Sequence, residues 1–88
     1  MVNDELLKLR NLGKTSAQWL HATGIHSLEE LRTRGPVASY CAVRARGFRA
    51  SKSLLFAIAG AIQDIHWNDL DPAYKAQLIE QLEHYRDH

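Results

Sequence analysis

The sequence is poor in cysteine and proline and has no long hydrophobic run. Cys41 is the single cysteine among 88 residues, so an intramolecular disulfide and a thiolate metal cluster are excluded. The longest apolar or glycine run, Leu54 to Ile62, has nine residues, whereas a helix needs about 20 to cross a bilayer. The first ten residues carry acids and no secretory h-region. We therefore expect a cytoplasmic protein without a membrane partner.

Strand-like alternation, repeats and linkers are also absent, and the composition suits a small packed core. Apolar residues make up 45% of the chain and charged residues 24%, which excludes wholesale disorder. We expect residues 1–88 to form one domain. The predicted fold is all-α, a compact bundle of five to six short helices.

Capping and stop residues set the expected helix boundaries. We predict a first helix capped by Asn3, a second at about Ser16 to Thr23 that stops at Gly24, and a third that begins with the Ser27 and Glu30 capping box. A fourth runs from Pro36 to near Gly47, a fifth is capped by Ser51 or Ser53, and the last begins at Asp71 and Pro72. The fifth of these is apolar around its whole circumference, which places it at the centre. Gly60 would let another helix approach it closely.

The stretch from Leu9 to Leu20 contains the most informative turn. It resembles the helix-hairpin-helix motif, because Leu9, Leu12, Gly13 and Ala17 match its apolar, glycine and alanine positions, while Asn11 replaces its first glycine. The predicted fold therefore includes a helix-hairpin-helix-like (SAM-like) element. Asparagine and glycine both tolerate positive φ, so the turn is feasible. We expect Thr15 or Ser16 to cap the second helix.

This turn and a basic cluster are the candidate nucleic-acid site. Residues 1–52 carry a net charge of +5 and residues 53–88 a net charge of −4, and residues 44–52 hold four cations and no acid. Backbone amides at a helix start, together with nearby cations, can bind a phosphate. The candidate residues are Gly13, Lys14, Thr15, Arg46, Arg49 and Lys52. A capped turn, arginines that complement a helix C-terminus and a core-packed Phe48 explain the same residues structurally.

Other chemistry is weakly represented. The catalytic motifs of nucleophilic hydrolases, P-loop proteins and zinc proteases are missing, so we expect neither an enzyme nor a cofactor. His84 and His88 are four residues apart, but their terminal position argues against a metal site. Aromatic residues dominate many protein interfaces. The candidate interface residues are Trp19, Phe48, Trp67 and Tyr85.

A resemblance covers nearly the whole chain, from about Leu9 to Glu83. The sequence is similar to the C-terminal domain of the TfoX/Sxy family of bacterial competence regulators. The most specific matches are the residues 11–13, Gly24 with Ile25, Leu28 with Leu31, the small-residue helix at 54–61, and the residues 65–67.

That resemblance implies a compact all-α domain that helps to turn on DNA-uptake genes together with the cyclic-AMP receptor protein. In that family a separate N-terminal domain precedes this one. The resemblance transfers no catalytic residues to this chain. Two hypotheses follow: a transcriptional regulator domain that contacts the DNA backbone weakly, or a protein-interaction or dimerisation module whose partner is the receptor protein, RNA polymerase or a second copy.

Overall fold

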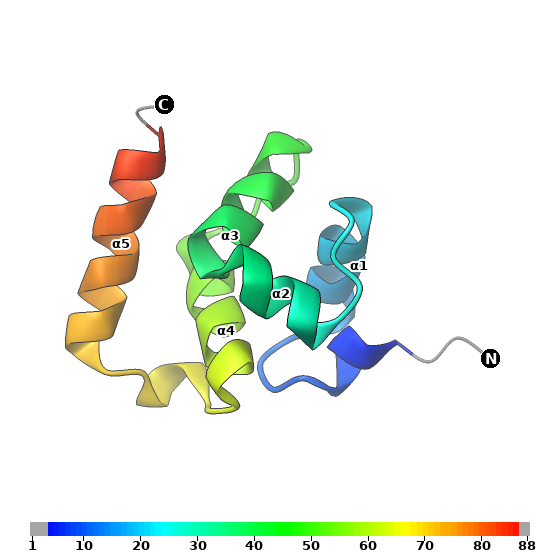
Figure 1. Ribbon diagram of the computed structural model, residues 1–88, viewed down its shortest axis with the longest axis horizontal. Helices are drawn as coiled ribbons and strands as arrows, with labels where there is room; N and C mark the ends of the chain where they lie inside the picture. Colours follow the sequence, from blue (N-terminus) through cyan, green and yellow to red (C-terminus); the bar gives the residue numbers. More distant parts are fainter. Residues whose placement is uncertain (1–3, 87–88) are drawn as a thin grey trace.

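The computed structural model describes residues 4–86, and in this range every regular element is helical. The elements are η1 (Glu5–Lys8), α1 (Lys14–Ala22), α2 (Leu28–Arg34), α3 (Pro36–Ala45), α4 (Lys52–Gln63), η2 (Trp67–Asp69) and α5 (Pro72–Arg86). Figure 1 shows α3 and α4 in the middle, α1 on one side and α5 on the other. The all-α prediction is therefore confirmed, with five α-helices and two 3-10 helices in the described range.

The central position predicted for the fifth helix is also confirmed. Leu55, Ile58 and Ala59 of α4 are fully buried, since an apolar circumference is stable only when other helices cover it. The other helices each contribute one to three side chains to this core, among them Leu20, Leu31, Val43 and Leu78.

Several predicted caps are confirmed and others are wrong. The Ser27 hydroxyl accepts a hydrogen bond from the Glu30 N–H at 3.1 Å, and the Asp71 carboxylate accepts one from the Ala73 N–H at 2.9 Å. Gly24 ends α1 with a φ of 89°. Thr15 and Ser16, however, lie inside α1, which begins one residue after Gly13 and has no side-chain cap. The cap expected at Thr15 or Ser16 is missing because Gly13, which has an extended backbone and no hydroxyl group, occupies the N-cap position of α1.

The start of α4 follows the same pattern. Ser51 occupies the N-cap position without a side-chain hydrogen bond, and Ser53 lies inside the helix. At the start of the described range, Asp4 caps η1, with its carboxylate accepting from the Leu6 N–H at 3.0 Å. The cap predicted at Asn3 lies outside the described residues. Because η1 is a 3-10 helix of four residues, only the second arm of the turn is an α-helix, and the helix-hairpin-helix likeness stays a prediction.

Asn11 holds the turn against the far end of α4. Its φ of 73° lies in the left-handed region, as its glycine-like place in the sequence predicts. Its Nδ2 donates to the Ile65 carbonyl at 2.9 Å, and its Oδ1 accepts from the Trp67 N–H at 3.2 Å. A segment 54 residues further along the chain is thereby tied to the turn.

Gly60 makes this contact possible. A Cβ at Gly60 would lie 2.4 Å from Asn11 Nδ2 and 2.7 Å from the Ile65 carbonyl oxygen. The close approach expected at Gly60 is therefore seen, with the Cα of Trp67 in the 3-10 helix η2 lying 3.4 Å from such a Cβ, but none of these three neighbours belongs to another α-helix. The turn and the 64–67 segment pack here only because no side chain stands at position 60.

A second set of hydrogen bonds attaches η1 to the bundle. Asp4 Oδ1 lies 2.9 Å from His21 Nε2, and the His21 and His26 rings stack with their Nδ1 atoms 2.5 Å apart. Glu5 Oε2 accepts from the Leu28 N–H at 2.7 Å. The hydrogen bond from His21 is the main cause that lowers the pKa of the Asp4 carboxyl below its usual value of 3.8.

This lowered pKa predicts a loss of stability in acid. A carboxyl with a depressed folded-state pKa stabilises the fold above its unfolded pKa, and that contribution is lost as the pH falls through the folded value. We therefore expect Asp4→Asn to reduce the dependence of the melting temperature on pH below about 4. Asp69→Asn, on an exposed residue, is the matched control. An unchanged acid slope in Asp4→Asn would contradict the assigned role of Asp4.

Candidate functional site

The start of α1 carries the amides predicted to bind phosphate. Gly13, Lys14 and Thr15 are all exposed, and Gly13 serves as the N-cap without a side-chain hydrogen bond. The first turn of α1 therefore presents backbone N–H groups that no cap covers. Such groups sit at the positive end of the helix dipole, which favours an anion.

A groove lies beside this helix start. We call it the hairpin groove; its volume is about 380 Å³ and it is lined by Asn11, Thr15, Ser16, Trp19, Arg49, Ser51, Ser53, Leu54, Ala57 and Trp67. Its lining combines the first turns of α1 and α4, four hydroxyl side chains, two indole rings and one arginine. Within residues 4–86, none of the residues that line it is acidic. Its polar groups are therefore donors or neutral hydroxyls, a set that suits an anionic ligand.

The structure brings only part of the predicted nucleic-acid set together. Thr15 and Arg49, which are far apart in sequence, line the same groove. Lys52 lines a different groove, and Gly13, Lys14 and Arg46 line neither, although all three are exposed. In the described part of the chain, the ion pairs are Arg10 with Asp64, His21 with Asp4 and His84 with Glu80. The candidate cations Lys14, Arg46, Arg49 and Lys52 thus keep their charge unpaired within residues 4–86.

Sequence reasoning missed the serines of the hairpin groove as a group. Ser51 and Ser53 were assigned only to capping, and Ser16 likewise, yet all three line the groove. The signal for them was present, because hydroxyls at two helix starts can also contact a phosphate. What the sequence could not show is that the starts of α1 and α4 meet at one groove.

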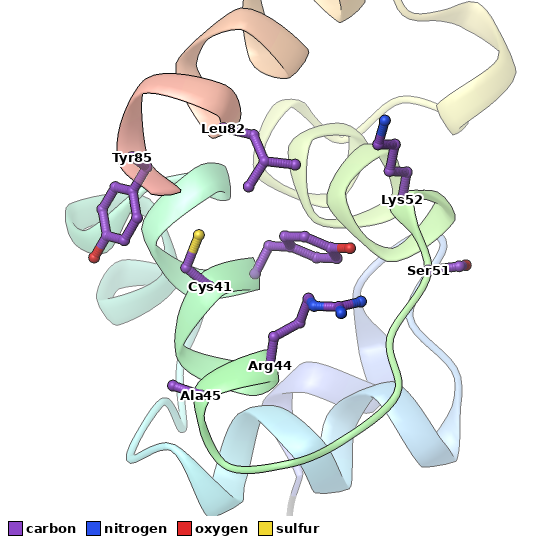
Figure 2. A pocket seen from close by; sticks show the side chains of 8 residues that line it. Cys41, Arg44, Ala45, Ser51, Lys52, Leu82 and Tyr85 are labelled. Atoms are coloured by element: carbon purple, nitrogen blue, oxygen red, sulfur yellow. The ribbon is translucent and has the colours of Figure 1, made fainter. Parts of the chain in front are cut away.

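The second groove lies between α3, the start of α4 and the end of α5. We call it the α3–α5 groove; its volume is about 530 Å³ and it is lined by Tyr40, Cys41, Arg44, Ala45, Ser51, Lys52, Leu82 and Tyr85. Figure 2 shows Cys41 and Tyr85 on one side of it and Ser51 and Lys52 on the other. Neither Tyr40 nor Leu82 was a predicted site residue; both were missed because they come from helices that the sequence does not place side by side.

The predicted interface aromatics occupy different surroundings. Trp19 and Phe48 are half-buried and stack on each other with ring centres 5.4 Å apart. Trp67 is 37% exposed and Tyr85 48% exposed. The Lys75 ammonium lies 5.6 Å from the centre of the Trp67 ring, which shields one part of that indole. Tyr85 is therefore the most open of the four.

The described residues hold neither a cluster of metal ligands nor a membrane-spanning helix. Among the described residues, no cluster of three or more His, Cys, Asp or Glu side chains is arranged to hold a metal ion. His84 lies 4.0 Å from Glu80 on the same helix, and His88 lies outside the described range. Within that range, none of the helices has both the length and the apolar character needed to cross a membrane.

The described residues thus form a small all-α domain with two open surface grooves. The TfoX C-terminal domain family matches residues 2–82. The chain belongs to this family, and the resemblance inferred from the sequence is confirmed.

Two solved structures are similar over most of their length. One is the crystal structure, in a triclinic form, of an uncharacterized protein from Listeria monocytogenes, with 31% identity, a TM-score of 0.84 and coverage of 94% of both chains. The other is a tetragonal form of a protein of unknown function from Listeria monocytogenes, with 33% identity, a TM-score of 0.80, and coverage of 85% of this chain and 93% of that chain. No curated protein matches the chain.

Proposed function

We propose that this TfoX C-terminal domain acts as a transcriptional regulator module that contacts the DNA backbone weakly and without sequence preference. The observation that carries the proposal is the hairpin groove, where Thr15 and Arg49 meet at the uncapped starts of α1 and α4 without an acidic neighbour in the lining. Phosphate contacts of this kind position a protein on DNA but do not read its bases. The module has no catalytic role in this proposal.

The proposal assigns different roles to the candidate residues. The N–H groups at the start of α1 and the hydroxyl of Thr15 donate hydrogen bonds to one phosphate in the groove. Arg49, which lines the same groove, binds that phosphate as well. Lys14 and Arg46, which are exposed but do not line the groove, add positive charge. A net charge of only +1 limits long-range attraction to DNA, so we expect micromolar or weaker affinity in moderate salt, within the range of non-specific binding of about 10⁻⁴–10⁻⁶ M.

Fluorescence anisotropy of a labelled duplex tests this function. With about three phosphate contacts, raising the salt concentration from about 50 to 200 mM should weaken binding roughly 40-fold. We expect Arg49→Glu and Lys14→Glu each to weaken binding and to reduce the salt slope by about one contact. Arg32→Glu is the matched control, because Arg32 is exposed and lines neither groove. Equal affinity and slope in all three variants would refute the proposed site.

The second candidate function is a protein-interaction or dimerisation module without DNA binding. The exposed rings of Tyr85 and Trp67 favour it, because aromatic side chains supply much of the binding energy at interfaces. Its partner would be the cyclic-AMP receptor protein, RNA polymerase or a second copy of the domain. Sedimentation as a monomer, together with absence of binding to the receptor protein and the polymerase, would count against this function.

A further inference from the structure

The α3–α5 groove has an apolar end and a cationic end. Cys41, Leu82 and Tyr85 gather at one end, and Arg44, Ser51 and Lys52 lie toward the other (Figure 2). Leu82 is only 5% exposed, whereas Tyr85 is 48% exposed, so the apolar end has a packed base and an open ring at its edge. Among the residues that the structure describes, those lining the groove include no acid. Its surface therefore offers apolar contact and positive charge side by side.

The positive charge of Arg44 is held in place by neutral partners. Its Nη1 donates to the Ala50 carbonyl at 2.6 Å, and its guanidinium carbon lies 6.0 Å from the centre of the Tyr40 ring. The buried Tyr40 hydroxyl donates to the same carbonyl at 3.2 Å. A guanidinium has five N–H donors, and this bond uses one of them. The rest of the planar group remains suited to a carboxylate, its usual two-pronged partner.

Lys52 supplies a second positive charge toward the same end of the groove as Arg44. It is the first residue of α4 and is exposed. Within residues 4–86, neither Lys52 nor Arg44 belongs to an ion pair. A positive side chain at a helix start is also opposed by the helix dipole. An anionic group in the groove would relieve this unfavourable placement.

Size and polarity indicate the occupant. A groove of about 530 Å³ matches the size of a site for a small ligand or for a few side chains. A stable interface with a second folded copy would take about 20–30 residues on each partner, whereas eight residues line this groove. A nucleic-acid backbone would pair with Arg44 and Lys52 but would offer no apolar group to pack against Leu82 and Tyr85. An acidic peptide with a large apolar side chain satisfies both ends.

We propose that the α3–α5 groove binds a partner segment that presents a large apolar side chain close to one or more carboxylates. The apolar side chain packs between Leu82 and Tyr85, and the carboxylate binds Arg44 and Lys52. This interaction is separate from the proposed DNA contact, because the two grooves share only Ser51 among their lining residues. It also gives Lys52 a role in protein binding rather than in the nucleic-acid set predicted from sequence.

Selection from a phage-displayed library of random peptides tests the proposal with the whole chain as the target. We expect the enriched peptides to carry Asp or Glu within one helical turn of Leu, Ile, Phe, Trp or Tyr. A fluorescein-labelled copy of an enriched peptide then serves as the probe for fluorescence polarisation. Lys52→Glu and Tyr85→Ala should each weaken its binding about three- to tenfold, whereas Arg32→Glu should leave it within about twofold.

Both test positions are exposed, and glutamate suits the first turn of a helix, so the variants should fold; equal melting curves check this. The proposal is overturned if no peptide is enriched, if enriched peptides lack the acidic residue, or if Lys52→Glu and Tyr85→Ala bind as tightly as the parent. It is also overturned if the chain sediments as a dimer that Tyr85→Ala dissociates, since a second copy would then fill the groove. Loss of duplex binding in Lys52→Glu with peptide binding unchanged would assign Lys52 to DNA instead.

Discussion

Replacing Asn11 with alanine is expected to destabilise the domain by about 2–3 kcal/mol, because side-chain hydrogen bonds are lost and alanine disfavours the left-handed backbone conformation. The Ile65 carbonyl loses its donor at 2.9 Å and the Trp67 N–H loses its acceptor at 3.2 Å. Alanine must also adopt the φ of 73°, which favours glycine and asparagine. In a chain of this size, that loss corresponds to a fall in melting temperature of about 10–20 °C.

A second substitution separates the two contributions. Glycine at position 11 tolerates the positive φ, but Asn11→Gly still removes the side-chain hydrogen bonds to Ile65 and Trp67. We expect it to be about 1 kcal/mol more stable than Asn11→Ala, and still clearly less stable than the parent. Thermal and urea unfolding followed by circular dichroism measure both differences. If Asn11→Gly were as stable as the parent, the hydrogen bonds to Ile65 and Trp67 would contribute nothing.

Gly60→Ala should have the opposite effect from the usual one. In the middle of a helix, glycine is about 1 kcal/mol less favourable than alanine, so the substitution would ordinarily stabilise α4. Here the new Cβ would lie 2.4 Å from Asn11 Nδ2 and 2.7 Å from the Ile65 carbonyl oxygen. Both neighbours must move, and overpacking of this kind costs about 1–3 kcal/mol. Subtracting the gain in helix propensity leaves an expected net destabilisation of about 1 kcal/mol.

Two comparisons test this explanation. Gly13→Ala is the steric control, because a Cβ there meets nothing within 4 Å, and we expect only the cost of alanine at the N-cap of α1, about 0.5–1 kcal/mol. The double variant of Asn11→Gly with Gly60→Ala should be destabilised by less than the sum of the two single variants, by about 0.5 kcal/mol or more. Strict additivity would show that the side chain at Asn11 and the space at Gly60 act independently.

The helical content and the central helix were predictable because each rests on a local or periodic signal. The Ser27 and Asp71 caps are short-range patterns, and α4 is apolar on every side, so its central position needed no tertiary information. The positive φ of Asn11 was also predictable from its place before Leu12 and Gly13. These features depend on residues that are neighbours in the sequence.

The features that failed depend on contacts between distant segments. Nothing near Gly60 indicates that its neighbour is Asn11, and nothing near Thr15 indicates that Arg49 lies across the same groove. The α3–α5 groove likewise needs α5 to return beside α3, which places Leu82 near Arg44. Ser51 occupies its expected N-cap position but makes no side-chain hydrogen bond, and Thr15 lies inside α1. Both outcomes have a local reason, since hydroxyl residues favour a cap without requiring one.

The contact between Asn11 and Gly60 also limits how this sequence can change over time. A side chain at position 60 fits without strain only if the residue at position 11 is smaller and the backbone at 64–67 is rebuilt, because all three occupy the same space. No single substitution achieves that. Among related sequences, we therefore expect positions 11 and 60 to vary together, with asparagine retained wherever glycine is retained, and with a different length or composition of the 64–67 segment where both are replaced.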